Sequence, residues 1–149
     1  MPANIQYNGT AYIGTSTFEY AITPALGLFG TGMGSRFQAA NTPAQGYMLW
    51  SLGGGMAFRF PDPLFSSLHA WSLGVVYTQQ WWTYDAPDPT VDPTTARTQL
   101  DSIVSITLSV PFDERTTMRV SAGRFSRGSN LPNYAFANNT AMLGVSWRF

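Results

Sequence analysis

Apolar and polar residues alternate with a period of two along most of the chain. Between Leu100 and Phe112, the even-numbered positions are mostly large and apolar, and the odd-numbered ones are mostly Ser, Thr or Asp. Such alternation is typical of a β-strand whose two faces meet different environments. Thirteen residues is long for a strand of a soluble sheet, where about 5–6 are usual, but it suits a tilted strand that crosses a membrane.

The same alternation predicts six further strands and no helix. They span residues 9–22, 25–37, 47–60, 68–84, 116–127 and 135–149. The segment 25–37 is rich in glycine, so its apolar face cannot be fixed from the sequence. The pattern continues to the last residue, Phe149, although chain ends usually fray into water.

The predicted connections alternate in length. Those near residues 23–24, 61–63 and 113–115 are tight, whereas residues 38–46, 85–97 and 128–134 form longer segments rich in Pro, Asn, Asp and Thr. Short turns at one end and longer loops at the other are typical of outer-membrane barrels.

Aromatic residues gather near both predicted ends of the strands. Those near the short turns are Trp71, Trp147, Phe58, Phe60, Phe112 and Phe149, and those near the long loops are Trp50, Trp81, Trp82, Tyr47, Tyr84, Tyr134 and Phe136. Two aromatic belts around an aliphatic band match two membrane–water interfaces.

Composition supports one unusual domain. Charged residues make up 11% of the chain, against roughly 25% in soluble domains, and a water-exposed surface needs charge. Eight arginines balance eight acidic residues, which disfavours a nucleic-acid-binding protein. There is no cysteine, so disulfides and thiolate metal sites are excluded, and the first residues show no signal peptide. We expect a single domain over residues 1–149.

The end of the chain resembles the terminal signal of bacterial outer-membrane β-barrel proteins. Gly144, Trp147 and Phe149 reproduce the glycine–x–x–aromatic–x–aromatic ending that the barrel-assembly machinery recognises in that family. Met142 stands where the family often has a polar residue. The resemblance implies an antiparallel up-and-down transmembrane β-barrel in the bacterial outer membrane, with the lipid bilayer and the assembly machinery as partners.

Strand number follows from this resemblance and from one turn signal. Barrels of the family have an even number of strands, whereas the alternation predicts seven. The dipeptide Asn8-Gly9 is a strong hairpin signal. It predicts a short eighth strand over residues 3–7 and therefore an eight-stranded barrel. The alternative is that the chain is the C-terminal part of a longer barrel.

Charged residues occupy the face opposite the predicted lipid-facing residues. This predicted lumen charge cluster consists of Glu19, Arg59, Asp101, Arg119 and Arg148. A charge facing hydrocarbon is costly, so we expect these side chains in the lumen. The simpler reading is a set of ion pairs that closes a narrow barrel, and the functional one is an anion-selective ring. Ions or a small ligand are the expected lumen contents.

Other candidate chemistry has a structural explanation. The glycine runs at 30–34 and 53–55 precede no predicted helix, so they favour bending of a closed sheet over a phosphate loop. His69 is the only histidine, and Ser67 and Ser72 lie near it; an outer-membrane hydrolase is therefore a minor alternative. Three aspartates in 85–92 lack the spacing of a calcium loop. No catalytic residue, metal or cofactor is predicted.

Two classes of function therefore stay open. The first is a structural or surface protein, or a narrow pore, built as an outer-membrane barrel. The second is a soluble ligand-binding barrel of lipocalin type, whose apolar face turns inward.

Overall fold

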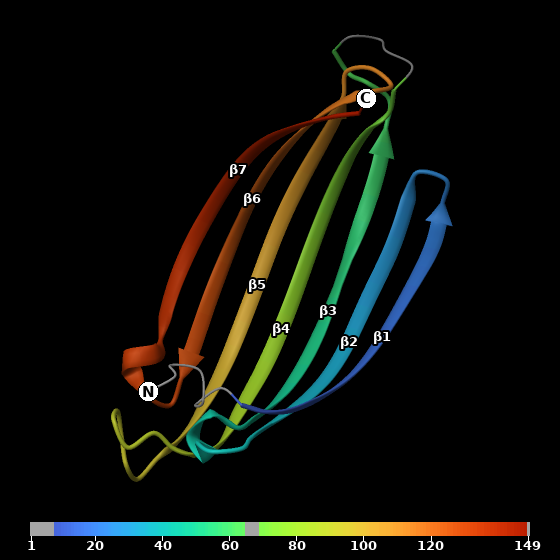
Figure 1. The fold of residues 1–149 in the computed structure, drawn as a ribbon. Coiled ribbons are helices and arrows are strands. Elements are labelled where there is room, and N and C mark those ends of the chain that lie inside the picture. Colours follow the sequence, from blue (N-terminus) through green and yellow to red (C-terminus); the bar gives the residue numbers. More distant parts are fainter. Residues whose placement is uncertain (1–7, 65–68, 149) are drawn as a thin grey trace.

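The computed structural model describes residues 8–64 and 69–148. Within them, the chain forms one antiparallel sheet in which each strand pairs with its neighbours in sequence (Figure 1). The strands are β1 (Gly9–Thr23), β2 (Leu26–Ala39), β3 (Tyr47–Phe60), β4 (Trp71–Pro87), β5 (Ala96–Pro111), β6 (Thr116–Ser129) and β7 (Phe136–Trp147). The predicted all-β, antiparallel up-and-down architecture is confirmed.

Several strand ends differ from the prediction. β3 has the predicted bounds, but β4 and β5 extend into the predicted loop 85–97, because Pro87 pairs with Ala96. β4 begins at Trp71, so the predicted start is wrong for residues 69 and 70, and residue 68 lies outside the described residues.

The connections lie at two ends of the sheet (Figure 1). We call the end with residues 24–25, 61–64, 69–70 and 112–115 the turn end, and the end with 40–46, 88–95 and 130–135 the loop end. Two short 3-10 helices, Pro43–Gln45 and Pro132–Tyr134, lie in the loop-end connections. The connection 61–70 is longer than any at the loop end, so the predicted alternation of lengths is wrong there.

The two faces of the sheet differ in chemistry. Paired residues point to the same side of an antiparallel sheet, so the register carries each face from strand to strand. On β5, Val104 and Ile106 are 40% and 46% exposed, whereas Asp101 is 1% exposed. We call the face with Val104 the outer face and the face with Asp101 the inner face.

The register also determines which residues of β2 lie on the outer face, a point that the sequence did not settle. Gly30 pairs with Phe18, and Gly34 pairs with Trp50, so these glycines lie on the outer face. A Cβ at Gly34 would lie 2.8 Å from the Trp50 ring, and one at Gly30 would collide with the Phe18 ring. Glycine therefore lets the two aromatic rings lie flat across β2.

The sheet encloses almost no apolar core. Leu49, Val110 and Leu131 are the buried apolar residues found in the described part of the chain. The accessible surface is 10363 Å² for 16.3 kDa, against about 7,500 Å² for a compact monomer of that mass. Folding alone thus leaves a large surface that a partner or solvent must cover. Nor is any helix of the described residues long and apolar enough to cross a membrane.

The sheet is curled but has two edges. Ala57 on β3 and Gly144 on β7 line the same hollow, so the inner face is concave. β1 and β7 are the outermost strands, and both run from the loop end to the turn end. The described residues place no partner strand beside either edge.

The predicted hairpin at Asn8-Gly9 is wrong. The carbonyl of Asn8 accepts the amide of Ala40 at 2.8 Å, and Gly9 pairs with Ala39. Both residues therefore continue the line of β1 instead of reversing it. The predicted strand 3–7 lies outside the described residues.

Candidate functional site on the inner face

The inner face of the described strands holds most of the polar side chains, and it changes character along the strands. Near the loop end it carries aromatic rings and arginines. Toward the turn end it carries Ser, Thr and Gly, with arginines between them.

A buried ion pair joins β5 to β6 near the loop end. Arg127 Nε and Nη2 donate to the two carboxylate oxygens of Asp101, at 2.7 and 2.6 Å. The Asp101 side chain is 1% exposed and that of Arg127 is 25% exposed. The Arg127 guanidinium also lies 5.4 Å and 5.5 Å from the ring centroids of Phe125 and Phe136. Two-point pairing of this kind fixes both side chains.

A second arginine on the inner face is stacked between aromatic rings. The Arg97 guanidinium carbon lies 3.8 Å from the ring centroid of Tyr84 and 4.1 Å from that of Tyr134. Tyr47 contacts both Tyr84 and Trp82, with centroids 5.9 and 5.0 Å apart. Contacts between aromatic rings and a guanidinium stabilise such a cluster.

This cluster corrects the predicted aromatic belt at the loop end. Trp50 and Trp81 are paired on the outer face and are 58% and 41% exposed. Tyr47, Tyr84 and Trp82 instead share the inner face, since neighbouring strand residues point to opposite sides. The inner rings therefore belong to the candidate site and not to the outer surface.

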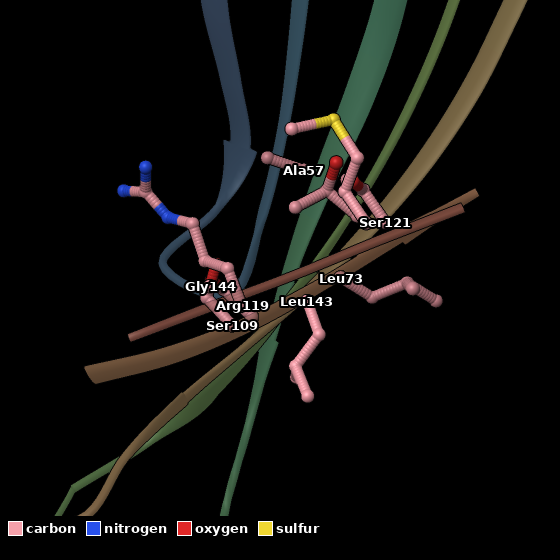
Figure 2. A pocket seen from close by; sticks show the side chains of 11 residues that line it. Ala57, Leu73, Ser109, Arg119, Ser121, Leu143 and Gly144 are labelled. Carbon is pink, nitrogen blue, oxygen red and sulfur yellow. The ribbon is translucent and has the colours of Figure 1, made fainter. Parts of the chain in front are cut away.

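A hollow of about 480 Å³ lies on the inner face in the half near the turn end. Figure 2 shows Arg119, Ala57 and Ser121 on one side of the strands, and Leu73 and Leu143 pointing to the other. The polar residues that line it are Ser72, Thr107, Ser109, Arg119 and Ser121. None of the described residues that line the hollow is acidic.

The five residues of the predicted charge cluster come from five different strands or strand ends, and the register places Arg59 and Arg119 in line across the inner face. Glu19 is on the edge strand β1, Arg59 on β3 and Arg119 on β6. Arg148 directly follows β7, and its amide donates to the carbonyl of Arg115. Asp101 pairs with Arg127, a partner that lies 26 residues away and that sequence reasoning missed. The ion pairs found between described residues include no pair within the predicted cluster.

Charge is nevertheless segregated between the faces. By register and alternation, the inner-face arginines are Arg59, Arg97, Arg119, Arg127 and Arg148, and the inner-face acids are Glu19 and Asp101. Five positive groups against two negative ones give this face a net charge of +3, although the whole chain is neutral. The other acidic residues lie in connections or, for Asp85, at the loop end of β4.

Two arginines on strands depart from the expectation that charge lies inside. Arg36 donates to Asp85 on the outer face near the loop end, with one N–O distance of 2.8 Å. Arg124 is exposed on the outer face of β6, where it pairs in register with Val104 and Asn139. The outer face is thus apolar over most, but not all, of its area.

The predicted assembly signal lies on the last strand. Gly144 lines the hollow, and Trp147 is 58% exposed on the outer face, in register with Thr116. Phe149 lies outside the described residues.

The minor candidates for metal binding and hydrolysis concern the loop aspartates and the residues around His69. Asp88 and Asp92 accept hydrogen bonds from Thr90 and Thr94 in their own loop, and Asp85 accepts from Arg36. These contacts lower the pKa of both loop carboxyls, chiefly through the threonine hydroxyls. The described residues hold no group of three His, Cys, Asp or Glu able to bind a metal. Ser67, one part of the hydrolase alternative, lies outside them.

No protein-family model matches the chain, and no curated protein or solved structure matches it.

Proposed function

We propose that the chain is an integral β-barrel protein of the bacterial outer membrane, acting as a structural or surface protein or as a narrow pore. The supporting observation is the outer face of the sheet. Large apolar side chains stand exposed there on every strand, among them Leu52 at 62% and Leu143 at 72%. Soluble monomers rarely expose a continuous apolar patch of more than a few hundred Å². Lipid is a solvent that suits such a face.

The orientation of the two faces supports lipid over a bound apolar ligand. A lipocalin-type barrel would place apolar side chains on the concave side. Here the lining of the concave hollow is mostly hydroxyls, glycines and one arginine, although Met142 lines it too and aromatic rings lie on the concave side near the loop end. The convex side carries Ile106, Val104 and Leu143.

Strand direction supports closure by additional chain. β1 and β7 run in the same direction, so joining them directly would create a parallel pair. An odd number of additional strands lets every pair be antiparallel. One additional strand that runs from the turn end to the loop end and lies between β1 and β7 would meet this requirement and give an eight-stranded barrel. In the longer-barrel alternative, several preceding strands would do so.

Solubility and electrophoresis test the proposal together. The purified chain should need detergent to stay monomeric. After refolding into lipid vesicles, it should resist SDS until boiled, as judged by a mobility shift on a gel. A monodisperse protein without detergent would exclude the membrane function and favour the soluble barrel. Planar-bilayer recordings then separate a pore, which gives current steps, from a plugged structural barrel.

A further inference from the structure

The inner-face hollow combines space, hydroxyl groups and one guanidinium. Its volume of about 480 Å³ exceeds the roughly 30 Å³ of a water molecule many times over. It is bounded by strands β3 to β7. A Cβ added at Gly144 would meet no atom within 4 Å, so the floor of the hollow is open at this strand.

The polar groups around the hollow are suited to a negative ligand. Arg119 contributes a planar fork of N–H donors that matches the oxygens of carboxylate and phosphate groups. Ser109 and Ser121 are neighbours of Arg119 on this face, since Ser109 is opposite it on β5 and Ser121 is two residues further along β6. Each hydroxyl can turn to donate.

No acidic side chain neutralises this guanidinium in the described structure. The ion pairs found between described residues do not include Arg119. Asp101 is occupied by Arg127 on two oxygens. The remaining inner-face acid, Glu19, is on β1 and does not line the hollow. A positive group facing a hollow without a counter-charge attracts an anion from solution.

We propose that this hollow binds a small oxyanion such as inorganic phosphate, held by Arg119 and the surrounding hydroxyls. The inference rests on the proposed function in one respect, since closure of the barrel would make the hollow part of the lumen and strengthen its field. The inner face has a net charge of +3, which favours a negatively charged ligand along the whole concave side.

Calorimetric titration with inorganic phosphate at pH 7 tests the inference. The full chain is refolded in a maltoside detergent, because phosphocholine detergents would themselves supply phosphate. We expect one phosphate per chain and at least tenfold weaker binding by Arg119→Gln. Arg119→Lys keeps a point charge without the fork, so its binding should lie between the two. A wild-type chain without saturable phosphate binding overturns the inference.

Arg124→Gln is the matched control. It removes an exposed arginine from the same strand on the opposite face, so phosphate binding should stay within twofold of the wild type. If Arg124→Gln weakens binding as much as Arg119→Gln, the ion is attracted by overall charge and the proposed site is refuted.

Glu19→Gln tests the competing explanation that closure brings Glu19 onto Arg119. We expect its phosphate affinity to stay within twofold of the wild type. If phosphate binds to Glu19→Gln but not to the wild type, Arg119 is paired with Glu19 in the wild type and the proposed oxyanion site is refuted. The SDS-gel shift keeps the two proposals separate. A chain that inserts but binds no phosphate contradicts this inference alone, and one that is soluble without detergent contradicts the barrel.

Discussion

Removing Arg127 from the Asp101–Arg127 pair should lower the free energy of unfolding more than removing Asp101. Asp101 is 1% exposed and Arg127 is 25% exposed. Arg127→Met leaves a carboxylate with almost no access to water and without its two donors. Removing one partner of a buried pair costs about 3–5 kcal/mol. Asp101→Asn leaves a guanidinium that still reaches solvent and lies near two aromatic rings, so we expect a smaller loss, about 2 kcal/mol.

Urea unfolding of the refolded chain in vesicles, followed by tryptophan fluorescence, measures both losses. The exposed pair Arg36–Asp85, with side chains 33% and 31% exposed, is the control. Asp85→Asn should change the unfolding free energy by no more than about 1 kcal/mol, because exposed ion pairs contribute little. A loss below about 1 kcal/mol for Arg127→Met, or a larger loss for Asp101→Asn than for Arg127→Met, would refute the reasoning from burial.

Three further outcomes follow from the two faces and the chain ends. Ile106→Arg, on the outer face, should weaken insertion into vesicles by about 2–4 kcal/mol, whereas Thr107→Arg, on the inner face, should not. If Thr107→Arg impairs insertion and Ile106→Arg does not, the assignment of the outer and inner faces is reversed. Deleting Phe149 should lower the yield in cell membranes but not refolding in detergent, and equal loss in both would reduce its role to packing. The amides of Arg115 and then Thr116 hold the pKa of the Asp113 carboxyl below its usual value. The turn should therefore keep this stabilisation above about pH 4 and lose it as acid protonates the folded carboxylate. Hydrogen exchange of the two amides measures this loss as a fall in their protection relative to the intrinsic exchange rate at the same pH. Protection that stays constant as the carboxylate is protonated would contradict the assignment.

The period of two was enough to locate the strands, because each face meets a different environment. It predicted β3 at both ends and placed Ile106 and Asp101 on opposite faces. It could not predict the extra length of β4 and β5. The loop-end hairpin is extended by the pairing of Pro87 with Ala96, which depends on register and not on local composition.

The candidate site was less predictable for the same reason. Asp101 was placed in the predicted charge cluster without a specific partner, and its partner is Arg127 on the next strand, which the cluster did not include. Only the register between β5 and β6 brings these residues opposite each other. The predicted aromatic belt was wrong at the loop end because it considered only how far along a strand each ring lies, and not which face the residue points to. Trp81 and Trp82 are adjacent in sequence yet lie on opposite faces.

The environment of the outer face is the central claim, and β5 offers a direct measurement. The chain has no cysteine, so single cysteines can be placed along the strand and labelled with nitroxide in refolded vesicles. Collision rates with oxygen, which concentrates in lipid, and with a water-soluble nickel complex are then compared at each position. We predict high oxygen and low nickel rates at Val104, Ile106 and Leu108, and the opposite or a restricted signal at Ile103, Ser105 and Thr107. High nickel rates at Val104, Ile106 and Leu108 would place the apolar face in water and contradict the membrane barrel.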